Sequence, residues 1–137
     1  MLLKDLIERQ DGIISVSPTQ TARDAAKVMD KANVGCTAVM EGDNLVGVFT
    51  ERDLVRRVLV RNLDVDAVKV SEVMTKEIVS GSPNDNLRDS EMRMRQSHIR
   101  HLPVLDDGGK ILGLLSIRDL LREQTKELRE YIALREG

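Results

Sequence analysis

The sequence predicts an α+β fold in which two tandem β-α-β-β-α repeats pack through their sheets with pseudo-two-fold symmetry. Internal repetition is the first reason, since the Ser-Pro pair at Ser17 recurs at Ser82 and the same shift of 65 residues carries Asp24 onto Asp89. The second reason is that the apolar spacing changes in the same order in both copies. Half a sheet of this size leaves one face uncovered, so the two copies are expected to complete one stable body.

Each repeat is expected to open with a short strand and a helix. Residues 13–17 and 78–82 are rich in β-branched side chains and end at a Ser-Pro pair, where proline stops a strand ladder. Thr21 and Asn86 each stand three residues before an aspartate, a spacing in which a side-chain oxygen caps the start of a helix. The helix that follows has a regular apolar face in the first copy. In the second copy only part of the matching face is apolar.

Each repeat is expected to close with a β-hairpin and a second helix. The hairpin strands are predicted over residues 36–40 and 45–49, and again over 102–105 and 110–115, around turns rich in Gly, Asp and Asn. The closing helices are predicted over residues 51–60 and 117–134. The chain is thereby divided into a first repeat with an N-terminal linker segment (1–60), a linker (61–77) and a second repeat with an extended last helix (78–137).

Composition excludes several kinds of protein. With 21 basic and 23 acidic side chains in 137 residues, the chain has no global attraction to nucleic acid. One Phe, one Tyr and no Trp leave few stacking platforms, so a bound base would be held by aliphatic side chains and backbone. A lone Cys36 and only two histidines, His98 and His101, predict neither a disulfide nor a metal site. No apolar run approaches the roughly 20 residues of a membrane span, and we expect a cytoplasmic protein.

Two motifs at matching positions in the two copies, together with two phrases that each occur once, resemble the paired cystathionine β-synthase (CBS) domain module, here as a stand-alone Bateman module. They are Val-Gly-Val-Phe-Thr-Glu-Arg-Asp ending at Asp53, Leu-Gly-Leu-Leu-Ser-Ile-Arg-Asp ending at Asp119, the Ile-Arg-His-Leu-Pro-Val phrase from Ile99 and the linker phrase over residues 70–75. The resemblance covers nearly the whole chain. It implies clefts between the repeats that bind adenosine nucleotides, and a regulatory role.

The resemblance also implies which residues line each cleft. Asp53 and Asp119 would hold ribose hydroxyls, while Thr50 and Ser116 would bond ribose or phosphate. The opposite repeat would contribute four residues to the cleft of Asp53, namely Ser82, Leu87, Ile99 and Arg100. The cleft of Asp119 would draw on Ser17, Ala22, Val34 and Gly35.

The Thr-x-x-Asp and Ser-x-x-Asp elements have a second interpretation, because the same spacing is an ordinary capping box. Capping does not exclude binding, since the amino end of a helix favours an anion and a carboxylate there can accept from a ribose diol.

Arginine matches phosphate oxygens as a planar fork, and the four cationic candidates are Arg52, Arg100, His101 and Arg118. For Arg52 and Arg118, a solvated helix face is the alternative. The first copy has Gly35-Cys-Thr-Ala where the second has Arg100-His-Leu-Pro, so the two sites should differ. We expect the Asp53 site to take the more phosphorylated ligand.

The sequence therefore predicts a non-enzymatic regulatory module that senses AMP, ADP or ATP and acts through a partner. It contains neither a phosphate-gripping Gly-rich loop nor a recognisable catalytic triad. One alternative is a nucleic-acid or protein-interaction adaptor that uses the basic helix from Arg52 to Arg61, where the other candidates are Arg56 and Arg57. Another is S-adenosylmethionine or NAD(H) in the same clefts.

Apolar residues on the closing helices exceed what a small core needs, and they predict a disc-like homodimer. They are Leu54, Val55, Val58, Leu59, Leu120, Leu121, Leu128 and Ile132. The alternative is that these side chains simply cover the sheets.

Overall fold

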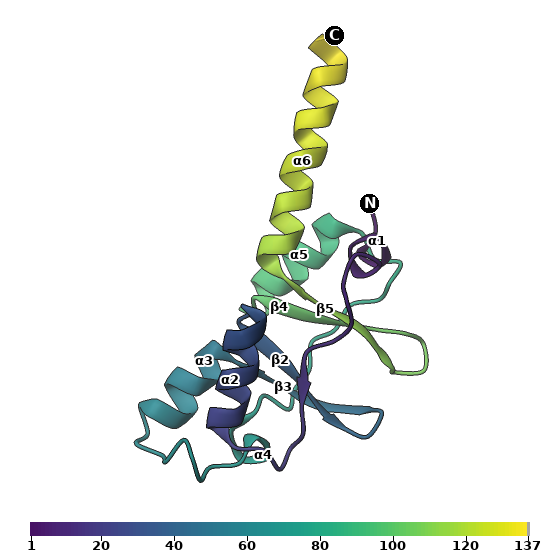
Figure 1. Ribbon diagram of the computed structural model, residues 1–137. Helices are drawn as coiled ribbons and strands as arrows, with labels where there is room; N and C mark the ends of the chain where they lie inside the picture. Colours follow the sequence, from purple (N-terminus) through teal and green to yellow (C-terminus); the bar gives the residue numbers. More distant parts are fainter. Residues whose placement is uncertain (137) are drawn as a thin grey trace. The chain divides into compact units, whose positions relative to one another are not determined.

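The computed structural model describes residues 1–136 and divides into two compact units (Figure 1). The first-repeat unit is Gly12–Ile78. The second-repeat unit combines Met1–Asp11 with the chain from Val79 onward. Each unit holds one small sheet with helices, so the predicted α+β class and tandem repeats are confirmed.

The first-repeat unit is built on a three-stranded sheet in the order β1-β2-β3. Strand β1 (Ser15–Val16) runs parallel to β2 (Cys36–Glu41), which pairs antiparallel with β3 (Asn44–Thr50). Helix α2 (Ala22–Ala32) packs on this sheet, and the fully buried Phe49 lies in the core between them. The predicted strand over residues 13–17 is thus confirmed in its central part only.

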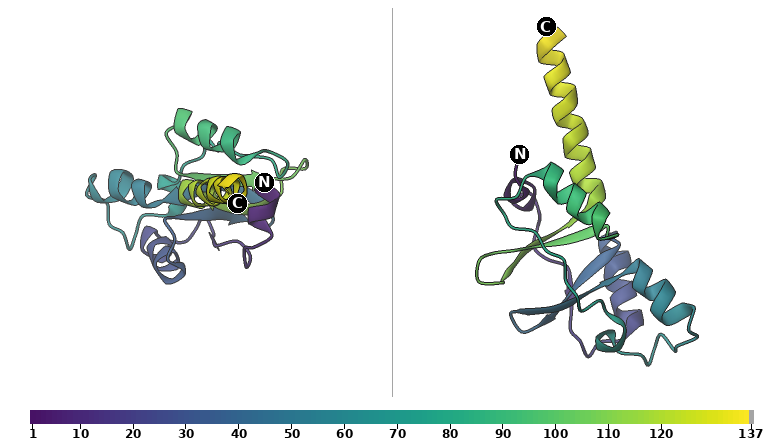
Figure 2. Two further views of the ribbon diagram at one scale, coloured as in Figure 1. Left: turned by 90° about the horizontal axis from the view of Figure 1, so that it is seen from above. Right: turned by 180° about the vertical axis from the view of Figure 1, so that it is seen from behind.

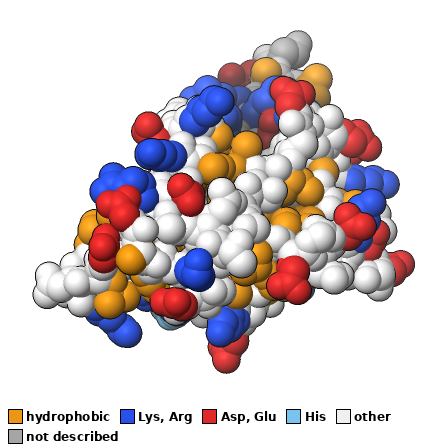
Figure 3. Space-filling view, turned by 60° about the horizontal axis from the view of Figure 1, so that its bottom comes forward, with side chains coloured by type: hydrophobic (Ala, Val, Ile, Leu, Met, Phe, Trp, Pro, Cys, Tyr) orange, Lys and Arg blue, Asp and Glu red, His pale blue; other side chains and the backbone are white. Residues whose placement is uncertain are grey.

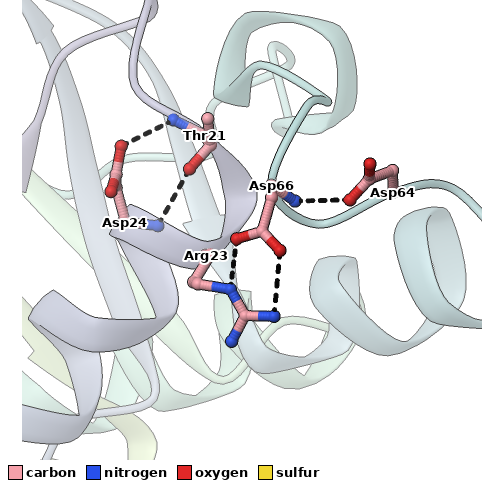
Figure 4. Close-up of polar contacts among 5 residues, drawn as sticks. All are labelled: Thr21, Arg23, Asp24, Asp64 and Asp66. Carbon is pink, nitrogen blue, oxygen red and sulfur yellow. Dashed lines mark hydrogen bonds and ion pairs between the residues drawn. The ribbon is translucent and has the colours of Figure 1, made fainter.

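Helix α2 begins where the sequence predicts, with a reciprocal cap (Figure 4). The Thr21 hydroxyl accepts from the Asp24 N–H at 3.2 Å, and the Asp24 carboxylate accepts from the Thr21 N–H at 3.1 Å. The backbone N–H groups of Ala22 and Arg23 donate to the carbonyls of Val68 and Val65, both at 3.0 Å. The first turn of the helix is therefore satisfied by its own side chains and by the linker.

The linker is also held by an exposed ion pair on α2 (Figure 4). The Arg23 guanidinium contacts both carboxylate oxygens of Asp66, whose own N–H donates to Asp64 at 2.9 Å. Their hydrogen bond raises the pKa of Arg23 and lowers the pKa of Asp66. Farther along, the linker forms the short helix α4 (Val70–Val73), whose Val70 and Val73 join the core.

The closing helix of the first repeat is not the regular α-helix predicted over residues 51–60. It begins as α3 (Glu51–Asp53) and continues as the wider π-helical turns η1 (Leu54–Leu59). The Val60 N–H donates to the Val55 carbonyl at 2.9 Å, five residues back. The segment contains no Gly or Pro, so its sequence carries no signal of the wider turn.

The second-repeat unit repeats the hairpin and its helices. Strand β4 (His101–Leu105) pairs antiparallel with β5 (Ile111–Ser116). The register shifts between Val104 and Leu105, at the place that matches the shift between Val39 and Met40 in the first repeat. Helix α5 (Leu87–Gln96) starts at the predicted cap Asn86. Helix α6 (Ile117–Glu136) is a 20-residue closing helix that extends well past α5 (Figures 1 and 2).

The first strand predicted for the second repeat, over residues 78–82, is reduced to one parallel bridge between Gly81 and Val104. Gly81 stands where the first repeat has the buried Val16, and it cannot fill the core. Leu3 on the short helix α1 (Leu3–Ile7) fills that space instead, since a Cβ on Gly81 would lie 2.9 Å from its side chain. Because the Leu3 side chain takes the place of the one missing at Gly81, residues 1–11 pack with the second repeat.

Charged side chains of both signs are interspersed with hydrophobic ones on the face shown in Figure 3. None of the described helices is both long and apolar enough to span a membrane.

Candidate functional site

The two strand-to-helix junctions have the same local geometry. At the end of β3, Thr50 Oγ1 accepts from the Asp53 N–H, and Asp53 Oδ2 accepts from the Thr50 N–H, both at 3.1 Å. At the end of β5, Ser116 Oγ accepts from the Asp119 N–H at 3.1 Å, and Asp119 Oδ2 accepts from the Ser116 N–H at 2.9 Å. Both motifs are therefore capping boxes, as the second interpretation of the sequence requires.

A neighbouring loop reaches each junction from within the same unit. The Glu51 N–H donates to the Gly35 carbonyl at 3.0 Å, and the Ile117 N–H donates to the Arg100 carbonyl at 2.7 Å. Gly35 and Arg100 occupy matching places in the two repeats. Within its own unit, Gly35 therefore lies beside Thr50, and Arg100 lies beside Ser116. The family resemblance had instead implied Gly35 at the cleft of Asp119 and Arg100 at the cleft of Asp53.

The Asp53 carboxylate is heavily engaged. Asp53 is 5% exposed, and both of its carboxylate oxygens lie 3.1 Å from the Thr75 hydroxyl. Arg57 Nε lies 3.4 Å from Oδ1, and Arg57 Nη1 donates to the Met74 carbonyl at 3.0 Å. A buried carboxylate is stable only when its charge is compensated, and here an arginine and a hydroxyl supply that compensation.

The matching carboxylate in the second repeat is more accessible. Asp119 is half-buried, while Arg118 beside it is exposed. The position that matches Arg57 is Glu123, which is 8% exposed and pairs with Arg9 through Oε1. Its other oxygen, Oε2, has no hydrogen-bond partner among the described residues. The two junctions therefore share a cap but differ in the charge that surrounds it.

Sequence reasoning did not find Thr75 and Arg57 as partners of Asp53. Thr75 closes the linker phrase over residues 70–75, and its backbone pairs with Val48 at the edge of β3, with N···O distances of 2.8 and 3.0 Å. In the second repeat the Gln10 side-chain amide takes that place, donating to the Leu114 carbonyl at 2.8 Å and accepting from its N–H at 3.3 Å. The motif at residues 70–75 was visible in the sequence, but its contact with Asp53 depends on tertiary pairing.

The other predicted site residues are distributed through both units. Ser17 and Ser82 lie in the turns before α2 and α5, where their N–H groups bond Gln20 and Asp85. Ala22 and Leu87 are buried in the cores, so their side chains serve packing. Exposed or partly exposed positions are Val34, Arg52, Ile99, Arg100 and His101.

The predicted basic stripe is interrupted, because Arg57 is held by Asp53 and Met74. The remaining members, Arg52, Arg56 and Arg61, are exposed. The π-helical turns also change the spacing along this face, so the stripe is not the regular helical one that the sequence predicts.

Helix α5 ends at Gln96, and His98 follows in a left-handed conformation with φ 56°. No group of three His, Cys, Asp or Glu side chains suited to a metal ion occurs among residues 1–136.

Cys36 is a buried residue at the start of β2, as predicted. Burial, with a smaller contribution from the nearby charge of Asp53, raises the pKa of the Cys36 thiol to about 12. The reactive thiolate is therefore scarce at neutral pH.

We expect Cys36 to resist alkylation by iodoacetamide in the folded protein at pH 7.5 and to react fully in 6 M guanidinium chloride. The physical reason is that both burial and the raised pKa suppress the thiolate. Mass spectrometry of timed samples measures the modified fraction. Rapid modification of the native protein would show that β2 opens locally.

The comparison with family models identifies the chain. The CBS domain model matches twice, at residues 3–60 and 70–126, and the chain belongs to the CBS domain family.

Curated and solved relatives agree with this assignment. The CBS domain-containing protein YhcV of Bacillus subtilis is 38% identical over 122 residues, covering 89% of this chain and 84% of its own length. A putative signal-transduction protein with CBS domains from Burkholderia ambifaria is 31% identical with a TM-score of 0.84, covering 90% of this chain and 93% of that one. The CBS domain protein PAE2072 of Pyrobaculum aerophilum, solved in complex with AMP, is 25% identical with a TM-score of 0.79, covering 92% and 99%. The chain spans 56–64% of the length of three further curated relatives.

Proposed function

We propose that the chain is a non-enzymatic regulatory module that binds an adenine nucleotide, AMP, ADP or ATP, and passes the ligand level to a partner. One observation carries the proposal. The half-buried carboxylate of Asp119 is held by a reciprocal cap at the amino end of the 20-residue helix α6, with Arg100 bonded to the same turn through its carbonyl.

This arrangement suits a nucleotide on chemical grounds. The amino end of a long helix carries a positive dipole end that favours phosphate. A carboxylate with one oxygen engaged in the cap keeps a second oxygen to accept from a ribose hydroxyl. Arg118 directly precedes Asp119 and is exposed, so its guanidinium can contribute the forked contact that phosphate oxygens prefer.

The Asp53 site has the same cap but a higher cost of binding. A ribose hydroxyl that bonds the Asp53 carboxylate must either displace the Thr75 hydroxyl or share the carboxylate oxygens with it. We therefore propose that Asp119 provides the stronger ribose contact. Two expectations from the sequence stay predictions. One is that the Asp53 site binds the more phosphorylated ligand, and the other is that residues of both repeats surround one ligand.

The AMP complex of PAE2072 supports an adenosine ligand for a protein of this family. S-adenosylmethionine and NAD(H) remain the alternatives for the same positions. A ligand can regulate only through different affinities for two arrangements of the protein, so binding alone does not identify the partner.

The first test is calorimetric titration with AMP, ADP, ATP, S-adenosylmethionine and NADH. We expect Asp119→Asn to weaken binding of the preferred nucleotide 10- to 100-fold, because a hydrogen bond to a charged group contributes about 1.5–3 kcal/mol. Asparagine keeps an oxygen that can accept from the Ser116 N–H, so the cap is preserved while the charge is removed. Asp53→Asn is expected to have a smaller effect.

Asp24→Asn is the matched control, because Asp24 occupies the same place in a third capping box, with Thr21. It should leave nucleotide affinity unchanged. Equal affinity in wild type and Asp119→Asn would contradict the assignment of Asp119. A folded protein that binds none of the five ligands would overturn the proposed function.

A further inference from the structure

The acceptor positions of the Asp53 carboxylate are filled by groups of its own unit. An ionised carboxylate offers about four lone-pair sites, two on each oxygen. Oδ2 accepts from the Thr50 N–H and from the Thr75 hydroxyl, both at 3.1 Å. Oδ1 accepts from the same hydroxyl at 3.1 Å and lies 3.4 Å from Arg57 Nε. A ligand hydroxyl that makes a full hydrogen bond to this carboxylate must therefore take the place of one of these three groups.

The Thr75 hydroxyl is the most replaceable of the three. The Thr50 N–H belongs to the cap that starts helix α3, and Arg57 supplies the compensating charge while it also bonds the Met74 carbonyl. Thr75 instead shares a single hydroxyl proton between two oxygens. Replacing it leaves both the cap and the counter-ion of Asp53 intact.

The position of the Thr75 hydroxyl also matches the demands of a ribose. A vicinal diol can donate one proton to each oxygen of a carboxylate. Thr75 bridges the same two oxygens, so its departure vacates one acceptor position on each of them. The hydroxyl therefore occupies the two places that a ribose diol would use.

The backbone of Thr75 holds this hydroxyl where it is. The Thr75 N–H donates to the Val48 carbonyl at 2.8 Å, and the Val48 N–H donates to the Thr75 carbonyl at 3.0 Å, at the edge of β3. Threonine is β-branched and has few favourable χ1 rotamers. The hydroxyl can leave Asp53 only by a change of rotamer or by release of the edge pairing, and either step reduces the net affinity for a ligand.

The second repeat has no such contact. With the shift of 65 residues, the counterpart of Thr75 is Gln10, whose side-chain amide bonds the backbone of Leu114. Among residues 1–136, the one hydrogen bond to the Asp119 carboxylate comes from the Ser116 N–H. Internal competition for the carboxylate is therefore confined to the first repeat.

We propose that Thr75 is a built-in competitor of the ribose at Asp53, which lowers the affinity of this site for any ligand that carries a ribose diol. The inference rests on the proposed function and deepens it, because it identifies the end of the linker phrase as the element displaced when the site fills. Thr75 lies in the segment of the chain that leads into the second-repeat unit. Filling the Asp53 site therefore changes a contact of that segment.

Calorimetric titration with ATP tests the competition in chains that also carry Asp119→Asn, which weakens the other site. Thr75→Ala in this background should bind ATP about three- to tenfold more tightly, because it removes the competing hydroxyl and opens its space. Thr75→Ser keeps the hydroxyl and should match the Asp119→Asn parent. Thr75→Val fills the space with a methyl group and should gain nothing. Without the diol, 2′,3′-dideoxy-ATP should bind the parent and Thr75→Ala equally.

A second measurement needs no substitution at Thr75. Three-bond NMR couplings to the Thr75 methyl group report its χ1 rotamer, and saturation of the wild type with ATP should change them. Unchanged couplings in the saturated protein would show that the hydroxyl stays on Asp53 and would overturn the inference.

The titrations overturn the inference in two further ways. One is a folded Thr75→Ala chain that binds ATP no more tightly than its parent, and the other is an equal gain for 2′,3′-dideoxy-ATP. Nucleotide binding by the wild type without a gain in Thr75→Ala would keep the proposed function and remove the competitor. ATP binding by Thr75→Ala but not by the wild type would do the reverse, and absence of ATP binding in every chain would overturn both.

Discussion

Replacement of Phe49 by alanine is expected to lower the free energy of unfolding by about 3–5 kcal/mol. Phe49 is the only phenylalanine, is fully buried and packs at the centre of the first-repeat core. Its removal takes away a large apolar surface and leaves a cavity that the strand β3 cannot close. A loss of this size is comparable with the whole stability of a small domain.

Urea unfolding followed by far-ultraviolet circular dichroism measures this loss, and Cys36 alkylation reports on the same unit independently. Phe49→Leu is the control, since it keeps most of the apolar volume and should cost much less than the alanine variant. A Phe49→Ala protein with an unchanged urea midpoint and unchanged m-value would show that the core repacks.

The second large effect is expected at Gly47, with Gly113 as its counterpart in the second repeat. A Cβ at Gly47 would lie 2.7 Å from Met74 Sδ and 2.9 Å from the Thr75 carbonyl oxygen, which is backbone. A Cβ at Gly113 would lie 2.9 Å from Gln10 Oε1 and Ile7 Cγ1, which are side-chain atoms. Gly47→Ala is therefore expected near the upper end of the roughly 1–3 kcal/mol typical of overpacking, and Gly113→Ala near the lower end.

Paired denaturation curves of the two alanine variants test the order of these effects. Displacing Thr75 also disturbs the partner of Asp53, so Gly47→Ala should speed Cys36 alkylation while Gly113→Ala should not. Equal destabilisation by both substitutions would show that the Thr75 backbone moves as readily as a side chain.

The apolar residues that predicted a homodimer differ in their burial. Val58 and Leu120 are fully buried and belong to the cores of their own units, which is the alternative that the sequence left open. Leu54 is partly buried against the first core, while the exposed members are Val55, Leu59, Leu121, Leu128 and Ile132. The dimer itself stays a prediction.

Much of the fold follows from local signals. The caps at Thr21, Asn86 and Thr50 form where a side-chain oxygen precedes an aspartate by three residues, because these bonds need no distant partner. The hairpins follow from turn residues between short apolar runs. The sequence did not predict helix α1, because five residues are too few for the spacing of Leu3, Leu6 and Ile7 to indicate a helix.

The candidate site was predicted in part. The sequence predicted the capped aspartates, but it assigned Gly35 to the cleft of Asp119 and Arg100 to the cleft of Asp53, whereas within the units Gly35 bonds the turn of Asp53 and Arg100 the turn of Asp119. The different surroundings of Asp53 and Asp119 could not be predicted, because they depend on Arg57, Thr75 and Arg9 contacting residues that their own motifs do not contain.

The sequence by itself determined the duplication, the α+β class and the caps, since these depend on residue spacing and on bonds within a few residues. Only the tertiary structure decided that Leu3 replaces the side chain missing at Gly81, and that Gln10 and Thr75 complete the two sheet edges. The physical reason is that buried volume and unpaired strand edges are satisfied by whichever segment lies nearest in space, regardless of its place in the chain.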